Sequence, residues 1–163
     1  MLEIGEFGKR PPKLEVRNID GGLLIQDSDL NRLTRESLST VTKAQPSEQE
    51  LDTALFTWKV LRYAKSNSIV IAKENTTIGL GAGQVSRVDA VHMALRKGGK
   101  NLKGGVLASD AFFPFRDSID VIKDSEIRVV IQPGGSIRDQ EVIGACDEYG
   151  IAMVFTGTRC FKH

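Results

Sequence analysis

Short apolar runs alternate with helical patterns over most of this chain, and this alternation most limits the possible folds. From Ser47 onward, runs of three to five mainly apolar residues, many of them β-branched, are separated by segments whose apolar residues recur every three or four positions. The runs predict buried strands, and the periodic segments predict amphipathic helices. This order predicts an α/β fold with a mixed, partly parallel sheet and flanking helices.

The boundaries of these elements carry local signals. Ser47 and Glu50 form a capping-box signature ahead of the first helix. Gly150 is placed to stop the last helix. The helices are expected to begin after Ser47, after Ser86, at Asp117 and at Asp139. The strands are expected at 68–72, 77–80, 106–108, 127–131 and 151–155, with the first two forming a hairpin.

The N-terminal part of the chain has a different pattern. We assign residues 1–46 to an arm or linker and residues 47–163 to the folded domain. Two short apolar runs at 14–16 and 22–25 predict an extended pair, or a strand that joins the sheet of another protein. Residues 27–46 are polar and show no helical or strand period.

Composition and charge argue against several classes of function. Twenty-two Lys and Arg oppose 21 Asp and Glu, so the net charge of +1 does not favour nucleic-acid or acidic-membrane binding. No apolar run approaches the ~18 residues of a membrane span, and the N-terminus lacks the features of a signal peptide. Cys146 and Cys160 form neither a disulfide framework nor a CxxC zinc pattern. We therefore expect a cytoplasmic protein.

Loops after the predicted strands hold the side chains best suited to ligand contact, because ligands of α/β sheets bind beyond strand ends. The loops at 81–87, 109–117 and 132–138 are expected to converge on one site. Just before the first strand of the domain, Asn67 offers an amide donor and acceptor that could orient a substrate carbonyl. The alternative is that Asn67 and its serine neighbours only satisfy the end of the helix.

A glycine-rich segment at 79–87 would allow close approach to a ligand. It is not a Walker A loop, and Gln84 stands where a dinucleotide fingerprint needs its final glycine. Arg87 lies at the start of a predicted helix, where the helix dipole opposes a cation, and this indicates an anion nearby. The alternative is a tight hairpin turn followed by an ordinary solvated arginine.

Three of the seven phenylalanines lie within four positions around Pro114, which prevents a regular helix or central strand there. A rigid aromatic loop flanked by Asp110 and Asp117 suits a flat heterocycle, because rings stack and carboxylates accept N–H bonds. The alternative is that these rings seal the core.

The C-terminal segment also offers ligand contacts. Arg159 can grip a phosphate or carboxylate bidentately, Phe161 can stack, and His163 can form hydrogen bonds. The alternative is a frayed tail.

Five longer motifs point to one family. They are KSNSIVIAK, GLGAGQVSRVDAV, ASDAFFPF, IQPGGSIRDQEVI and GIAMVFTGTRCFKH. In this order they resemble the C-terminal part of AICAR transformylase, which normally belongs to a bifunctional enzyme with IMP cyclohydrolase. The resemblance implies that 47–163 is the second of two cytidine-deaminase-like subdomains, without zinc. It implies a role in purine biosynthesis, in formyl transfer from 10-formyltetrahydrofolate to the 5-amino group of AICAR.

The resemblance also implies roles for individual residues. Asn67 would be the catalytic residue that positions the formyl and amide groups, and Asp117 would read the N–H edge of the pterin. The residues implied on the AICAR side are Phe112, Arg159, Phe161 and His163. Those implied on the folate side are Arg87, Val88, Pro114, Phe115, Asp117 and Ser136. A potassium ion bound by some members would match the oxygen donors Ser66, Ser68 and Asp110.

One departure from the family pattern limits what this chain is expected to do alone. Acid–base chemistry in the family uses a Lys-His dyad of the first subdomain, whereas Lys162-His163 here belongs to a different motif. We therefore expect this chain to need the first transformylase subdomain, in the same longer chain or as a separate protein. We also expect self-association through the face that this subdomain normally covers. The alternative function is a non-enzymatic folate- or nucleotide-binding or scaffold module.

Overall fold

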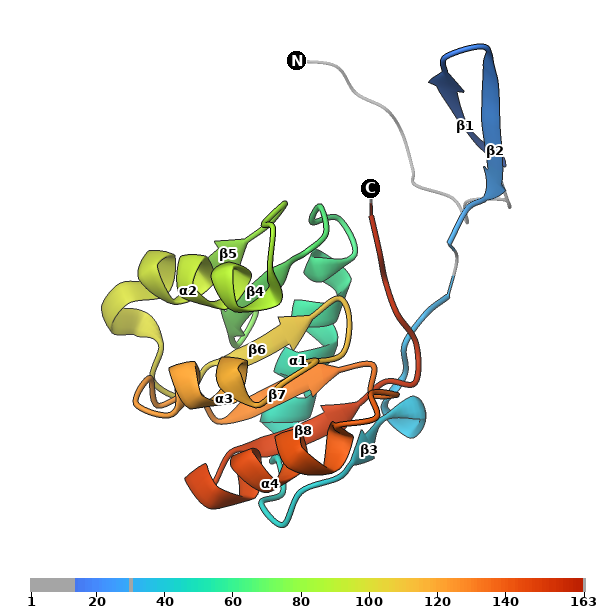
Figure 1. Cartoon of the computed structure of the whole chain (residues 1–163). Helices are drawn as coiled ribbons and strands as arrows, with labels where there is room; N and C mark the ends of the chain where they lie inside the picture. Colours follow the sequence, from blue (N-terminus) through green and yellow to red (C-terminus); the bar gives the residue numbers. More distant parts are fainter. Residues whose placement is uncertain (1–13, 30, 163) are drawn as a thin grey trace, which may run out of the picture. The chain divides into compact units, whose positions relative to one another are not determined.

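The computed structural model describes residues 14–29 and 31–162 (Figure 1). The chain divides into two compact units, with the boundary between Arg32 and Leu33. The sequence placed residues 33–46 in the arm, but the structure places them in the second unit. The reason is that β3 (Ser39–Thr40) pairs with the last strand, and the Met153 N–H donates to Thr42 Oγ1 at 2.8 Å.

The first unit contains an antiparallel hairpin of β1 (Leu14–Ile19) and β2 (Gly22–Asp27). This confirms the extended pair that the two apolar runs predict. Val16 lies opposite Ile25, and Gly21 takes the positive φ that the turn requires. Every residue of both strands is exposed.

A six-stranded mixed sheet forms the centre of the second unit, in the order β3-β8-β7-β6-β4-β5. β6, β7 and β8 are parallel, whereas β4 is antiparallel to both of its neighbours. The α/β fold class, with a mixed sheet and flanking helices, is confirmed. The remaining strands are β4 (Ile69–Lys73), β5 (Thr76–Gly81), β6 (Val106–Ser109), β7 (Val129–Gln132) and β8 (Ala152–Phe155).

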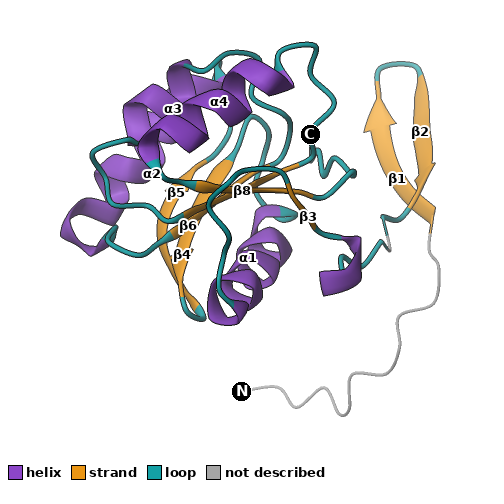
Figure 2. Ribbon diagram, turned by 90° about the horizontal axis from the view of Figure 1, so that it is seen from below, coloured by secondary structure: helices purple, strands orange, loops and turns teal. Residues whose placement is uncertain are grey.

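Helices cover both faces of this sheet (Figure 2). One face carries α1, and the other carries α2, α3 and α4. Ser47 caps α1 through a complete capping box with Glu50, and Gly150 ends α4 in the left-handed conformation, as predicted. The helices are α1 (Glu48–Leu61), α2 (Arg87–Gly98), α3 (Asp117–Ile122) and α4 (Asp139–Tyr149), with short 3-10 turns at Arg35–Ser37 and Gly99–Asn101.

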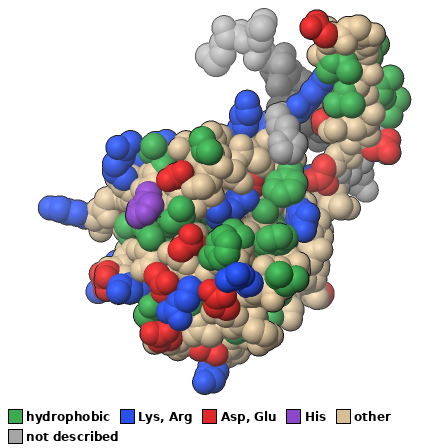
Figure 3. All heavy atoms as spheres, in the orientation of Figure 1, with side chains coloured by type: hydrophobic (Ala, Val, Ile, Leu, Met, Phe, Trp, Pro, Cys, Tyr) green, Lys and Arg blue, Asp and Glu red, His purple; other side chains and the backbone are tan. Residues whose placement is uncertain are grey.

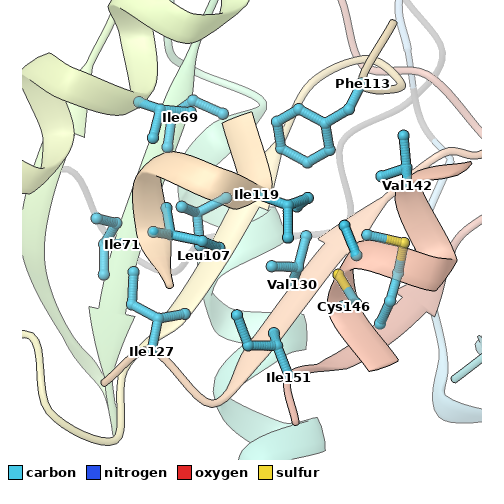
Figure 4. Packing of buried hydrophobic residues seen from close by; sticks show 14 of the residues in the cluster. Ile69, Ile71, Leu107, Phe113, Ile119, Ile127, Val130, Val142, Cys146 and Ile151 are labelled. Carbon is cyan, nitrogen blue, oxygen red and sulfur yellow. The ribbon is translucent and has the colours of Figure 1, made fainter. Parts of the chain in front are cut away.

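Both faces of the central strands are buried, which explains why these strands read as continuous apolar runs. Ile69 and Ile71 contribute to the cluster beneath α2 to α4 (Figure 4), whereas Val70 contributes to the cluster beneath α1. On β5, a Cβ at Gly79 or Gly81 would overlap backbone carbonyl oxygens of α2. These two glycines therefore let the helix pack directly on the strand.

Candidate functional site

Five loops meet at one edge of the six-stranded sheet. Ile69, at the start of β4, pairs with both Gly81 and Ser109, and Gln132 pairs with Phe155. The carboxyl ends of β5 to β8 therefore share this edge with the amino end of β4. The convergence predicted for three loops is confirmed, and two more join them. The five loops are 62–68, 82–86, 110–116, 133–138 and 156–162.

Backbone hydrogen bonds hold the C-terminal segment against the other loops. The Ser66 N–H donates to the Lys162 carbonyl at 2.9 Å, and the Cys160 N–H donates to the Asp110 carbonyl at 3.2 Å. The Thr156 N–H donates to the Gln132 carbonyl at 2.9 Å. As far as residue 162 this segment is thus part of the sheet edge and not a frayed tail. His163 lies outside the described residues.

A buried ion pair lies at the centre of this edge. The side chains of Arg87 and Asp110 are 7% and 0% exposed, and the guanidinium donates directly to the carboxylate. Asp110 also accepts from the Ser68 N–H at 3.1 Å and from the Ser66 hydroxyl. The position of Arg87 predicted a nearby anion, and that anion is a carboxylate of the same chain.

The same guanidinium orients Asn67. Arg87 Nη2 donates to Asn67 Oδ1 at 3.1 Å, while Asn67 Nδ2 donates to the carbonyls of Gln84 and Val85 at 3.0 and 3.3 Å. Because donors face one end of the amide and acceptors face the other, its orientation is unambiguous. Both amide hydrogens have partners, so Asn67 can still offer a ligand one lone pair of Oδ1.

The phenylalanines of the 110–116 loop divide between the core and the site. Phe113 is fully buried, and Figure 4 shows its ring directed toward Ile119 of α3. Phe112 is partly buried, and Phe115 is 47% exposed. The Phe113 ring therefore packs in the core, whereas the rings of Phe112 and Phe115 are partly or largely accessible to solvent at the sheet edge.

An arginine lies between two of the aromatic rings. The Arg159 guanidinium carbon is 5.0 Å from the centroid of Phe112 and 6.0 Å from that of Phe161. Both distances are within the range of cation–π attraction, and Arg159 itself is exposed. The geometry thus brings together the three described residues that the resemblance implied on the AICAR side.

The residues implied on the folate side lie on neighbouring loops and at the starts of α2 and α3. Phe115 stacks against Arg138 at 4.8 Å, and the Arg138 N–H donates to Ser136 Oγ at 3.1 Å. Asp117 begins α3, where its carboxylate accepts from the Ser118 N–H at 2.6 Å. Val88 and Pro114 are partly buried. Sequence reasoning missed Arg138, and its proximity to Ser136 in the IQPGGSIR motif was the available signal.

Comparison with known proteins identifies the family. The model of the AICARFT/IMPCHase bienzyme family matches residues 1–97, which is more than half of this chain. The chain belongs to this family.

Solved structures of bacterial RibD proteins also match. Acinetobacter baumannii RibD (form 2) has 19% identity and a TM-score of 0.43 over 66% of this chain and 35% of that one. A Thermotoga maritima diaminohydroxyphosphoribosylaminopyrimidine deaminase/5-amino-6-(5-phosphoribosylamino)uracil reductase has 22% identity and a TM-score of 0.38, over 62% of this chain and 33% of that one. This chain spans about a third of these structures. This similarity concerns the fold and gives no information about the activity of this chain.

In this member of the AICARFT/IMPCHase family, the three oxygen donors considered for potassium lie close together. The Ser66 hydroxyl donates to Asp110, and the Ser68 backbone donates to the same carboxylate. Ser68 Oγ is buried without a hydrogen-bond partner among the described residues. Within that part of the chain, no group of three or more His, Cys, Asp or Glu is arranged to hold a metal ion.

The surface of this family member is mixed in charge. Figure 3 shows basic, acidic and hydrophobic side chains interspersed on the face viewed, in keeping with the nearly neutral net charge. None of the helices in the described part of the chain is long and apolar enough to cross a membrane.

Proposed function

We propose that this chain forms the AICAR- and folate-contacting half of a formyltransferase site. In the proposed reaction a formyl group moves from 10-formyltetrahydrofolate to the 5-amino group of AICAR. One observation carries the proposal. Asn67, the Arg159 side chain with its two phenylalanine neighbours, and the 110–116 loop all lie at one edge of the sheet. Membership of the AICARFT/IMPCHase family supports this class of reaction.

In this proposal, Arg159 and its two aromatic neighbours bind the ribotide. An exposed guanidinium can form two parallel hydrogen bonds to a phosphate, and a planar imidazole can pack against phenylalanine rings. Phe115, stacked on Arg138, offers a second aromatic surface for the pterin. Asp117 would accept the N–H groups at the edge of that pterin.

Asn67 would align the reacting amine. The amino nitrogen attacks the formyl carbon, a C–N bond forms, and the bond from that carbon to N10 breaks. Over the reaction the amine loses one proton and N10 gains one. The remaining lone pair of Asn67 Oδ1 can accept an N–H of the amine, and Arg87 holds that oxygen in place.

The proton transfers need a group from elsewhere. His92 is the one histidine among the described residues, and it is exposed on α2. We assign general acid–base catalysis to the first transformylase subdomain, which would supply the Lys-His dyad. This chain would then complete the site only with that subdomain, and a homo-oligomer remains the expected assembly.

A potassium ion beside Asp110 would have a structural role, among the residues that surround this carboxylate. Ser68 Oγ supplies a buried oxygen without a partner, and Ser66 supplies a second hydroxyl. Arg87 already balances the charge of Asp110, so a monovalent ion suits the position better than a divalent one. Such an ion would hold the 62–68 loop in place.

The test is formyl transfer from 10-formyltetrahydrofolate to AICAR, measured for the chain alone and with the first subdomain added. We expect turnover only when both are present. In that mixture Asn67→Ala should lower the rate about 10²-fold. Asn75→Ala, in the exposed β4–β5 turn, is the matched control and should change nothing.

Two results would contradict the proposal. Turnover by the chain alone would show that its own residues perform the proton transfers. Ligand binding without turnover in the complete mixture would favour the alternative, a folate- or nucleotide-binding module.

A further inference from the structure

Gln132 is a polar side chain at an unusually buried position. It is the last residue of β7, where three apolar residues precede it, and its side chain is fully buried. A buried carboxamide costs free energy unless hydrogen bonds compensate for the lost water. The Gln132 side chain therefore needs hydrogen-bond partners among the residues at this sheet edge.

The partners of Gln132 lie in two other segments of the site. Oε1 accepts from the Phe113 N–H at 3.1 Å, and Nε2 lies 3.2 Å from Met153 Sδ. The Phe113 N–H demands an acceptor, so the amide oxygen must face it. The backbone carbonyl of Gln132 accepts from the Thr156 N–H. Gln132 thus connects β7 to the 110–116 loop, here called the aromatic loop, and to the start of the C-terminal segment at 156–162.

Phe113 is the anchor of the aromatic loop. Its ring is fixed in the core, its N–H is held by Gln132, and its neighbours are Phe112 and Pro114. Phe112 contacts Arg159, and Phe115 contacts Arg138. A shift of the Phe113 backbone would therefore move both rings and, with them, both proposed ligand surfaces.

We propose that Gln132 is a positioning residue that sets the geometry of the aromatic loop for ligand binding. It contacts no ligand itself and acts through the Phe113 N–H. This inference rests on the proposed function, because the affected ligands are AICAR and the folate.

The test compares three variants of the full chain. Gln132→Met keeps the length and leaves the Phe113 N–H without an acceptor. Gln132→Glu keeps an acceptor oxygen but buries a carboxyl group, which should lower overall stability. Met153→Leu removes the weak sulfur contact and leaves the bond to Phe113 intact. For each variant we measure amide hydrogen exchange at Phe113 and stability in urea. Binding of AICAR and tetrahydrofolate is measured by calorimetry with the first transformylase subdomain present.

We expect Q132M to bind both ligands about tenfold more weakly, with faster exchange at Phe113. M153L should bind like the parent chain. Q132E should retain Phe113 protection and bind more tightly than Q132M even if it is the less stable of the two. This order of ligand affinities, which differs from the order of stabilities, distinguishes loop positioning from a general loss of stability.

Three outcomes would overturn the inference. Unchanged Phe113 exchange in Q132M would show that the bond does not hold the loop. Unchanged ligand affinity in Q132M, with the parent chain binding normally, would leave the proposed function intact and refute only the role of Gln132. Failure of the parent chain to bind either ligand with the first subdomain present would refute the proposed function and this inference together.

Discussion

Two arginine–carboxylate networks in the second unit share the same chemistry and differ in their surroundings. The side chains of Arg87 and Asp110 are 7% and 0% exposed, whereas those of Arg116 and Asp120 are each 37% exposed. Water can replace a lost partner in the exposed network but not in the buried one. We therefore expect the buried Arg87–Asp110 pair to fix the geometry of the candidate site, whereas the exposed Arg116–Asp120 pair contributes little to stability.

The exposed network also titrates in a predictable way. Hydrogen bonds from Arg116 and from the Tyr149 hydroxyl lower the pKa of Asp120 below its usual value. Donation to Asp120 raises the pKa of Tyr149. Asp120 thus favours the folded state above the ordinary carboxyl pKa of about 4, and this contribution is lost as the pH falls through its folded pKa.

The strongest way to test the contrast is to remove the buried carboxylate. Asp110→Asn leaves the Arg87 guanidinium buried without a counter-charge, so the free energy of unfolding should fall by about 3–5 kcal/mol. Urea denaturation measures this loss. Asp124→Asn, at an exposed position, is the control and should be neutral. The double variant Arg87→Met/Asp110→Asn should be more stable than Asp110→Asn, and an equal or larger loss would contradict the charge argument.

A smaller effect is expected when the charge is kept and the geometry is changed. Arg87→Lys retains a cation but lacks the planar fork that contacts Asp110, Ser68 and Asn67 together. We expect a loss of about 1–3 kcal/mol in unfolding free energy. In the formyl-transfer mixture the rate should also fall, because Asn67 Oδ1 loses its donor. A Lys variant with parental stability and rate would show that charge alone is sufficient.

The exposed network should respond much less. Asp120→Asn is expected to lower the thermal midpoint by no more than about 2 °C, because solvent screens this pair. The difference should shrink further in 1 M NaCl. The penalty of Asp110→Asn should persist in the same salt, and equal salt sensitivity of the two variants would remove the distinction between the networks.

The smallest change concerns a single hydroxyl. Tyr149→Phe removes the O–H that donates to Asp120 at 2.8 Å, while the bidentate contact with Arg116 remains. The pKa of Asp120 should rise toward its usual value without reaching it. NMR titration of the Asp120 carboxyl between pH 2 and 6, in this variant and in the parent chain, measures this shift. An unchanged titration would assign the lowered pKa to Arg116 alone.

Much of the secondary structure could be predicted because its signals are local. The capping box at Ser47, the stop at Gly150 and the apolar runs act over a few residues, and the structure confirms the elements they mark. Residues 33–46 were assigned to the arm because β3 has only two residues and no visible period. That short strand depends on pairing with β8, which no local pattern reveals.

The sequence indicated which residues lie in the loops at this sheet edge, but not which residues they contact. The sequence indicated that Arg87 has an anion nearby, yet Asp110 lies 23 positions away. The sequence left open whether the phenylalanine rings of the 110–116 loop pack in the core or face a ligand, and the structure buries Phe113 and leaves Phe115 47% exposed. Gln132 was expected in the 132–138 loop, whereas the structure makes it the last residue of β7, where its side chain accepts from the Phe113 N–H.

The sequence by itself determined the fold class, most of the helices and strands and the family of this chain, because periodicity, caps and motifs are properties of neighbouring residues. The tertiary structure alone decided that Arg87 pairs with Asp110, that this pair orients Asn67, and that Gln132 holds the aromatic loop. These contacts join residues 19 to 23 positions apart, on different loops, on α2 and on β7. They exist only once sheet order and register bring the strand ends to a common edge.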